Sequence, residues 1–197
     1  MEVITKTCRA PNVNVRGALR YAGCSRGNYE MLELFHSCVD EAEPFLIYKV
    51  CYCVLDAKVH NAVCDFGYFS VQSEKLAKNL SGCERVILFA ATVGTVLDRL
   101  IAKYSRLSPS RAVMLQALGT ERVESLCDMF CMDFEIENNT VLKPRFSPGY
   151  GDLSLDVQND IFSVLNCQKN IGIYLNDSLL MSPSKSVTAF AGIGGNI

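Results

Sequence analysis

The segment from Lys143 to Asp152, KPRFSPGYGD, holds the residues best suited to chemistry. Two Pro and two Gly within these ten residues constrain the backbone and let it approach a ligand closely. Arg145 carries a planar guanidinium that suits a carboxylate. Tyr150 offers an aromatic face to a cation or a flat ring, and Gly149 has no side chain to block access. The segment is therefore either a ligand-binding loop or a rigid connector between two helices.

Other catalytic patterns have little support. Val93-Gly94-Thr95 follows an apolar run and precedes a helix, where α/β proteins bind phosphate, but one Gly also suits a tight turn, which we favour. GxGxxG, GxxxxGK[ST], GxSxG and HExxH are absent from the sequence. Neither of the two histidines, His36 and His60, stands in a pattern that indicates Ser/His/Asp catalysis. We therefore predict no catalytic residue.

Ten of the 197 residues are cysteines, which raises the question of disulfides or a metal. Residues 1–11 contain no apolar signal region, so we expect a cytoplasmic protein whose thiols stay reduced. Zinc sites use paired CxxC motifs, or CxxC with HxxxH, and neither occurs. Cys51 and Cys53 share a face of an expected strand, and Cys127 and Cys131 share a face of an expected helix. Both pairs are predicted to fill the core, and no metal is expected.

The composition excludes several classes of protein. The chain has 19 basic and 21 acidic residues, so it lacks the positive charge typical of proteins that bind nucleic acid or an anionic membrane. Its longest apolar stretch, 86–97, is too short to span a bilayer. With 49% hydrophobic and 20% charged residues and a mean hydropathy of +0.16, it is expected to fold. We expect one compact domain, with neither nucleic acid nor a membrane as partner.

The N-terminal part has clear helix and strand signals. Asn and Ser mark helix starts, and Gly and Pro mark helix ends. The apolar run at 85–92 indicates a strand buried on both faces. The expected elements are helices at 16–23, 28–42 and 73–80, with Asn28 and Ser73 as N-caps, strands at 45–55 and 85–92, and turns with one irregular strand at 56–72.

A long helix dominates the C-terminal part. Ser108-Pro109 opens it, and it is expected to run to about Met132. Gly119 in its middle costs about 1 kcal/mol relative to Ala, which suggests close packing there. Its buried face is expected to hold Met114, Ala117, Leu118, Val123, Leu126, Cys127 and Phe130.

The remaining elements complete the expected fold. They are an amphipathic helix around 97–104, a loop at 137–150, a helix at 153–165 capped by Asp152, and two strands within 171–193 around a turn at 181–184. Strands and helices do not alternate regularly. We therefore predict an α+β fold with a mostly antiparallel, curved sheet flanked by helices.

Residues 145–150, RFSPGY, resemble the RxxxGY signature of the activation domain of vitamin B12-dependent methionine synthase. Three further segments agree in order and spacing. They are VILFAATVG at 86–94, VMLQALGTERVESLCD at 113–128, and MSPSKSVT at 181–188, which is similar to M-x-P-x-x-S-V-S. The resemblance covers about residues 85–190. It divides the chain into an N-terminal part, 1–82, and an activation-domain core, 83–197, within one compact domain.

The resemblance implies S-adenosylmethionine as the ligand. It assigns Arg145 to the carboxylate of the methionine moiety and Glu124 to the lining of the same pocket. It gives backbone contacts to the segment from Ser147 to Gly149, and it places Tyr150 where the ligand meets the corrin. These expected roles are binding roles, and no residue is assigned a catalytic one.

The resemblance also implies partners. The chain has no homocysteine, folate or cobalamin module, so we expect it to act on a separate cobalamin-dependent methionine synthase that lacks its own activation domain. A flavodoxin- or ferredoxin-like protein would supply the electron for reductive remethylation. An alternative is a non-catalytic interaction module that docks on a corrinoid protein. A free-standing S-adenosylmethionine methyltransferase is less favoured, because a Gly-rich nucleotide loop is absent.

The interpretation of the cysteines predicts a protein that needs neither disulfides nor zinc. We expect a mild reductant to leave its circular dichroism spectrum and thermal midpoint unchanged. Elemental analysis of the purified protein should find far less than one zinc per chain. Stoichiometric zinc, or loss of the fold in reductant, would contradict this interpretation.

Overall fold

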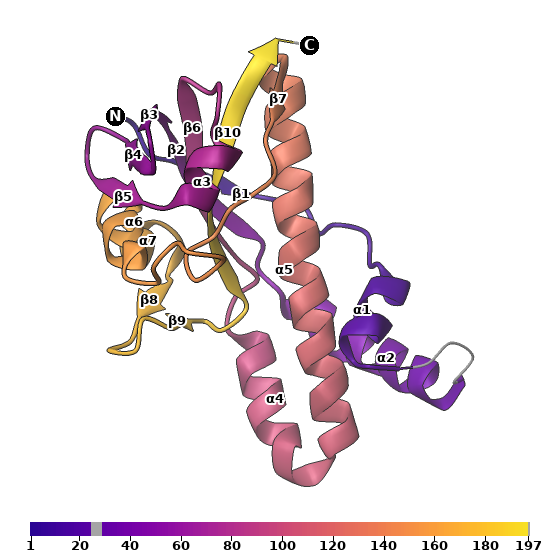
Figure 1. The fold of residues 1–197 in the computed structure, drawn as a ribbon. Coiled ribbons are helices and arrows are strands. Elements are labelled where there is room, and N and C mark those ends of the chain that lie inside the picture. Colours follow the sequence, from indigo (N-terminus) through magenta and orange to yellow (C-terminus); the bar gives the residue numbers. More distant parts are fainter. Residues whose placement is uncertain (25–28, 197) are drawn as a thin grey trace.

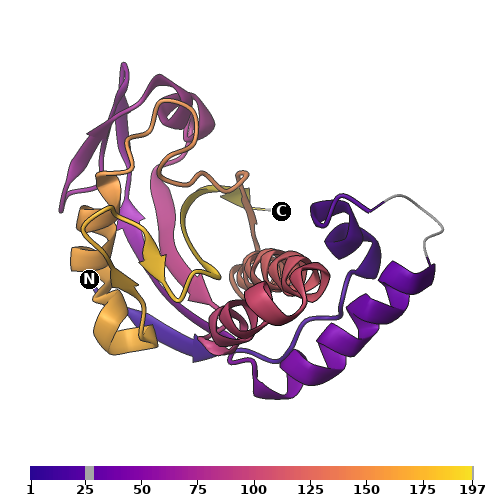
Figure 2. The same cartoon turned by 90° about the horizontal axis from the view of Figure 1, so that it is seen from below.

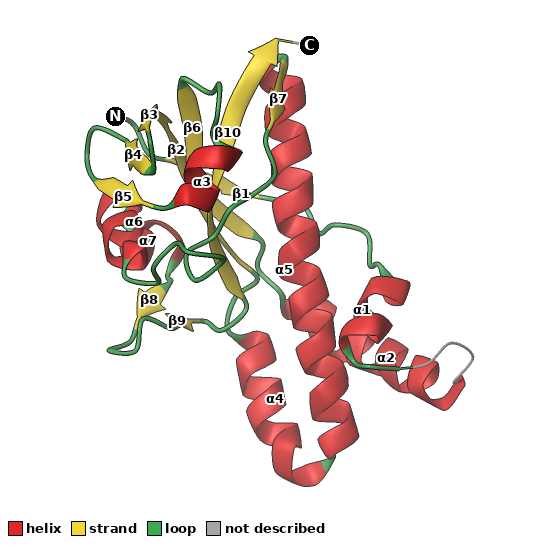
Figure 3. Ribbon diagram, in the orientation of Figure 1, coloured by secondary structure: helices red, strands yellow, loops and turns green. Residues whose placement is uncertain are grey.

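A computed structural model describes residues 1–24 and 29–196. The fold is α+β, as predicted, with a curved antiparallel sheet in the order β1-β2-β6-β10-β7 (Figures 1 and 3). The strands are β1 (Ile4–Thr7), β2 (Lys49–Asp56), β3 (Lys58–His60), β4 (Val63–Asp65), β5 (Ser70–Gln72), β6 (Arg85–Thr92), β7 (Thr140–Leu142), β8 (Tyr174–Leu175), β9 (Met181–Ser182) and β10 (Ser186–Asn196). The helices are α1 (Val15–Tyr21), α2 (Tyr29–Ala42), the 3-10 helix η1 (Glu43–Phe45), α3 (Glu74–Asn79), α4 (Val96–Leu107), α5 (Pro109–Asn138), α6 (Val157–Leu165) and α7 (Cys167–Ile171).

Strand β6 lies at the centre of the sheet, and every residue in it except Arg85 is buried. It pairs antiparallel with β2 on one side and with β10 on the other. Because successive side chains of a strand point to opposite faces, its apolar run supplies two cores at once. Ile87 and Phe89 enter one core, and Val86 and Leu88 enter the other. The predicted strand buried on both faces is confirmed.

The two faces of the sheet are covered by different elements. Helices α1, α2, α4 and α5 pack on the sheet in the first core, and α3, α6, α7 and the small sheet β3-β4-β5 pack on it in the second. Figure 2 shows the strands between α6 and α7 on one side and α4 and α5 on the other, with α1 and α2 beyond α5. Strand β2 pairs with β6, so the 1–82 and 83–197 parts of the chain share one sheet.

Helix α5 is the longest element and carries the predicted buried face. All seven residues expected on that face are buried. The helix continues past Met132 to Asn138, because Phe134 is also buried and its ring meets that of Tyr52 edge-on at 5.9 Å. At Gly119, a Cβ atom would lie 2.8 Å from carbons of Lys185, which confirms the expected close packing.

The N-terminal elements differ from expectation in two places. The strand expected at 45–55 begins only at Lys49, because Phe45 belongs to the 3-10 turn η1, which contains Pro44. The 56–72 segment forms the three short strands β3, β4 and β5 rather than one irregular strand. The helices expected at 16–23, 28–42 and 73–80 correspond to α1, α2 and α3, with Ser73 as the N-cap of α3. The predicted cap Asn28 lies outside the described residues.

The C-terminal elements also need correction. The helix expected at 153–165 begins at Val157, and Asp152 does not cap it. The loop expected at 137–150 contains the end of α5 and strand β7. The 171–193 segment contains three strands, β8, β9 and β10, rather than two. Strand β7 forms by pairing with the distant β10, which local sequence does not reveal, and β8 and β9 have only two residues each, too few for a strand pattern.

Arg122 on α5 fastens the N-terminal segment to the helix, and its side chain is fully buried. It donates hydrogen bonds to Glu121 Oε2 at 2.6 Å and to the carbonyl oxygens of Pro11 at 2.7 Å and Asn12 at 2.8 Å. A carboxylate oxygen of Glu43 lies 3.6 Å from Arg122 Nη1. The buried cation is therefore paired and hydrogen-bonded, as burial of a charge requires.

Removing this cation should leave Glu121 and Glu43 without their charge partner. We expect Arg122→Met to lower the free energy of unfolding by about 3–5 kcal/mol in chemical denaturation. The matched control is Arg99→Met, because Arg99 is exposed on α4, and it should change the value by less than about 0.5 kcal/mol. Equal losses in the two variants would contradict the assigned role of Arg122.

Candidate functional site

A cavity of about 520 Å³ lies between α5 and the segment that follows it; we call it the α5 cavity. One wall is the face of α5, and the other is the irregular edge of the sheet beside β10 (Figure 1). The lining residues are Glu124, Asp128, Cys131 and Glu135 from α5, Leu142, Lys143, Pro144, Arg145, Ser147 and Tyr150 from the following segment, and Val187 from β10.

The segment after β7 runs along the edge of β10, and this position directs Arg145. Lys143 N–H donates to Gly192 O at 2.8 Å, and Phe146 and Phe190 exchange two backbone hydrogen bonds of 2.9 Å. Neighbouring residues of an extended segment point to opposite faces. Phe146 enters the second core together with Phe190, and Arg145 points to α5. Burial of the phenylalanine thus aims the arginine at the helix.

The guanidinium of Arg145 bridges two carboxylates on α5. Its Nη1 atom lies 2.5 Å from Asp128 Oδ1, and its Nη2 atom lies 2.7 Å from Glu124 Oε2. Glu124 and Asp128 are four residues apart, so they project from one face of the helix. Partial burial lowers the pKa of Arg145, but the neighbouring Cys127 and the carboxylates of Asp128 and Glu124 together outweigh burial and raise that pKa. Glu124 and Arg145, both predicted site residues, therefore lie in direct contact.

A tight turn positions Tyr150 at the cavity. Gly149 has a φ of +83°, in the left-handed region that favours glycine, and Tyr150 N–H donates to Ser147 O at 3.1 Å. The Tyr150 ring packs edge-on against Phe146 at 5.3 Å and is 67% exposed. Ser147 and Tyr150 line the cavity, but Gly149 is absent from the described lining, and its N–H donates to Leu153 O at 2.9 Å.

Asp152 anchors the far end of the loop to α3. Its carboxylate accepts a hydrogen bond from the Ser73 hydroxyl at 2.5 Å and from Glu74 N–H at 2.8 Å. A longer contact comes from Lys75 N–H, at 3.3 Å. The carboxylate thus caps α3, a helix nearly 80 positions earlier in the chain, and not the helix that follows it. The predicted loop is therefore held at both ends.

The charges of the lining suit a ligand with cationic groups. Three carboxylates, on Glu124, Asp128 and Glu135, face two cations, on Lys143 and Arg145. Glu135 also accepts a hydrogen bond from Leu142 N–H at 2.7 Å, which fixes the start of the segment. Asp128 and Glu135 were not among the predicted site residues. A periodicity search from Glu124 along one helical face, at 128, 131 and 135, would have found them.

Cys51, Cys53 and Cys127 fill the core, as predicted, whereas Cys131 is only partly buried and lines the cavity. All ten are free thiols, and seven of them are buried. Burial raises the pKa of the Cys131 thiol, so the cavity is lined by a neutral thiol at neutral pH. Within residues 1–24 and 29–196, the structure contains no group of three or more His, Cys, Asp or Glu side chains that could hold a metal ion.

Together, these observations describe an α+β domain with a charged cavity that has an aromatic side chain at its edge. Its sequence matches no family model and no curated protein. Its fold is similar to a solved structure described as the crystal structure of the MetH reactivation domain bound to AdoHcy, with a TM-score of 0.67 and 15% sequence identity. The match covers 98% of this chain and 78% of that chain. The shared fold therefore includes nearly all of the N-terminal part, where no sequence resemblance is evident.

A helix that crosses a membrane must be both long and apolar. None of the helices in residues 1–24 and 29–196 combines the length and hydropathy that crossing a membrane requires.

The contacts of Asp152 predict a specific acid dependence. Hydrogen bonds from Ser73 and from the N–H groups of Glu74 and Lys75 hold the pKa of Asp152 below its usual value. The stabilisation is therefore fully present above the unfolded-state pKa of about 3.9 and is lost as the pH falls through the lower folded-state pKa. We expect Asp152→Asn to lower the thermal midpoint at pH 7, with a smaller difference from the wild type at pH 2–3.

The control for this experiment is Asp177→Asn, which changes an exposed aspartate in a turn. Its midpoint should follow the wild type at every pH. A difference between Asp152→Asn and the wild type that stays constant from pH 7 to pH 2 would contradict the assigned contacts.

Proposed function

We propose that the protein is a reactivation subunit for a separate cobalamin-dependent methionine synthase that lacks its own activation domain. In this role it binds S-adenosylmethionine in the α5 cavity. The observation that carries the proposal is the contact between Arg145, from the RFSPGY segment, and Glu124, at a cavity between α5 and the sheet edge. The likeness of the fold to a domain crystallised with AdoHcy supports the same ligand class.

The chemistry of the ligand fits the residues present. S-adenosylmethionine has a carboxylate, an ammonium, a sulfonium and a flat adenine ring, and a volume of about 520 Å³ is of the usual size for such a ligand site. Glu124 and Asp128 offer negative charge to the two cationic groups. The exposed face of Tyr150 offers a surface for the ring or the sulfonium. Ser147 adds polar contacts at the turn.

The proposed role separates binding from redox chemistry. The bound S-adenosylmethionine supplies the methyl group, the partner synthase holds the cobalamin, and a flavodoxin- or ferredoxin-like protein donates the electron. The residues of this chain bind and orient the ligand. A sulfonium needs no proton transfer to release its methyl group, so no general acid or base is required. Because burial raises the pKa of Cys131, its thiol stays protonated and does not compete as a methyl acceptor. The proposal places this role in the cytoplasm.

A second candidate is a non-catalytic module that docks on a corrinoid protein without using the ligand. Two observations favour it. The charge of Arg145 is already matched within the chain by Glu124 and Asp128. Met132 and Ile136, next to the cavity-lining residues of α5, are 60% and 76% exposed. An apolar ridge of this kind is typical of a contact surface.

Titration calorimetry with S-adenosylmethionine tests the proposal. We expect the wild type to bind S-adenosylmethionine. Arg145→Ala should weaken binding at least tenfold, which corresponds to about 1.4 kcal/mol. The reason is that this variant removes the contact between the loop and α5 and leaves the Glu124 and Asp128 carboxylates without their partner. Arg99→Ala, the exposed control on α4, should bind like the wild type.

Two results would count against this function. They are a wild type that does not bind S-adenosylmethionine, and undiminished binding by Arg145→Ala. Capture of a purified cobalamin protein that is equal with and without S-adenosylmethionine would favour the docking module instead.

A further inference from the structure

The side chain of Lys185, just before β10, packs closely over Gly119 of α5. A Cβ atom at Gly119 would come within 2.8 Å of the Lys185 Cγ and Cε atoms. The ammonium group of Lys185 donates to Thr120 Oγ1 at 3.3 Å. The Thr120 hydroxyl in turn donates to Gln116 O at 3.1 Å. The side chain of Lys185 is therefore held against the helix, with its charged end at a defined place.

The charge of Lys185 has no carboxylate partner in the described part of the chain. No Asp or Glu oxygen there lies within 4.0 Å of its ammonium group. The carboxylate of Asp98 acts on it from further away and accepts its own hydrogen bonds from the N–H and hydroxyl of Ser184. Burial lowers the pKa of Lys185, and Asp98 opposes that effect. A half-buried cation of this kind is suited to receive an anion.

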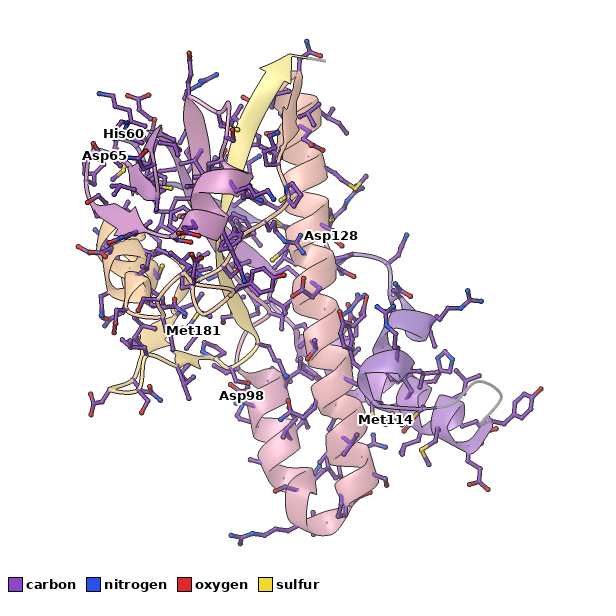
Figure 4. The ribbon with its side chains drawn as sticks, viewed as in Figure 1. His60, Asp65, Asp98, Met114, Asp128 and Met181 are labelled. Carbon is purple, nitrogen blue, oxygen red and sulfur yellow. The ribbon has the colours of Figure 1, made fainter. Side chains whose placement is uncertain are left out.

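Lys185 and the α5 cavity share one face of α5. Thr120, Glu124 and Asp128 follow one another at intervals of four residues, and the last two line the cavity. Thr120 is thus one turn, about 6 Å, below Glu124. Val187 also lines the cavity and lies on the same side of the strand as Lys185. Figure 4 labels Asp98 at the start of α4 and Asp128 on α5.

The existing contacts of Arg145 argue against a direct contact between its guanidinium and a ligand carboxylate. Both ends of its guanidinium are taken up by Glu124 and Asp128. A ligand carboxylate placed there would face two protein carboxylates at close range, and like charges repel. The ammonium group of Lys185, one helical turn away, has no protein carboxylate within ion-pair distance among the described residues.

Resting on the proposed function, we infer that Lys185 binds the carboxylate in the amino-acid part of S-adenosylmethionine. The ligand site then extends along α5 from Arg145 to Lys185. Arg145 is a positioning residue in this arrangement, because it fixes Glu124 and Asp128 where the ammonium and sulfonium of the ligand lie. Gly119 is part of the site as well, because it makes room for the lysine.

A comparison of two ligands tests this inference. The probes are S-adenosylmethionine and decarboxylated S-adenosylmethionine, which lacks only the carboxylate, both titrated by calorimetry into the full chain. We expect Lys185→Met to weaken S-adenosylmethionine at least tenfold and to leave the affinity for the decarboxylated ligand unchanged. Gly119→Ala, which displaces the Lys185 side chain but keeps its charge, should give the same pattern. Lys169→Met, at an exposed lysine on α7, is the matched control and should change neither affinity.

The outcomes separate this inference from the proposed function. Equal weakening of both ligands by Lys185→Met, or no weakening of either, would overturn the inference and leave the proposed function standing. The inference would also be overturned, and the proposed function left standing, if Arg145→Ala removes the preference for the carboxylated ligand and Lys185→Met does not. A wild type that binds neither ligand would overturn the proposed function itself. Thermal midpoints of both variants confirm that the folded protein is titrated, and Lys185→Gln replaces Lys185→Met if that variant fails to fold.

Discussion

The bridge from Arg145 to Glu124 and Asp128 is the contact on which the geometry of the cavity depends. It joins two walls of the cavity, the face of α5 and the segment along the sheet edge. A charge-assisted pair of hydrogen bonds to two carboxylates fixes both the distance and the direction of the guanidinium. Because the bridge is half buried, losing the arginine would also leave two facing carboxylates unpaired.

The rest of the fold keeps the two ends of this bridge in place. Strand β6, buried on both faces, supports β10, and β10 in turn holds the edge segment through Phe146 and Phe190. On the opposite side, the buried face of α5 packs on the sheet, and Arg122 fastens residues 11–12 to the same helix. At the far end of the loop, Asp152 is held by α3. Three separate anchors thus surround a site whose own residues are partly exposed.

The sequence predicted the elements whose signals are local. The apolar run of β6, the Ser-Pro start of α5 and its buried face depend on neighbouring residues, and they were correct. Contacts between distant segments were missed or misassigned. Asp152 was assigned to the following helix because a cap is normally local, whereas its partners are at 73–75. The position of Lys185 on Gly119 depends on tertiary packing, which no local pattern encodes. Strands β3, β4 and β5 pair with their neighbours in the chain, but each has only three residues, too few for an alternating pattern to stand out. Glu124 and Arg145, named through the family resemblance, do lie together in the structure.

A crystal structure of the protein grown with S-adenosylmethionine tests the proposed site most directly. We expect the ligand between α5 and the 143–150 segment, with its cationic groups facing Glu124 and Asp128, its carboxylate at Lys185 and an edge against Tyr150. Arg145 should keep its contacts to both carboxylates. A ligand bound elsewhere on the molecule, or an α5 cavity that stays empty at saturating ligand, would show that the proposed site is wrong.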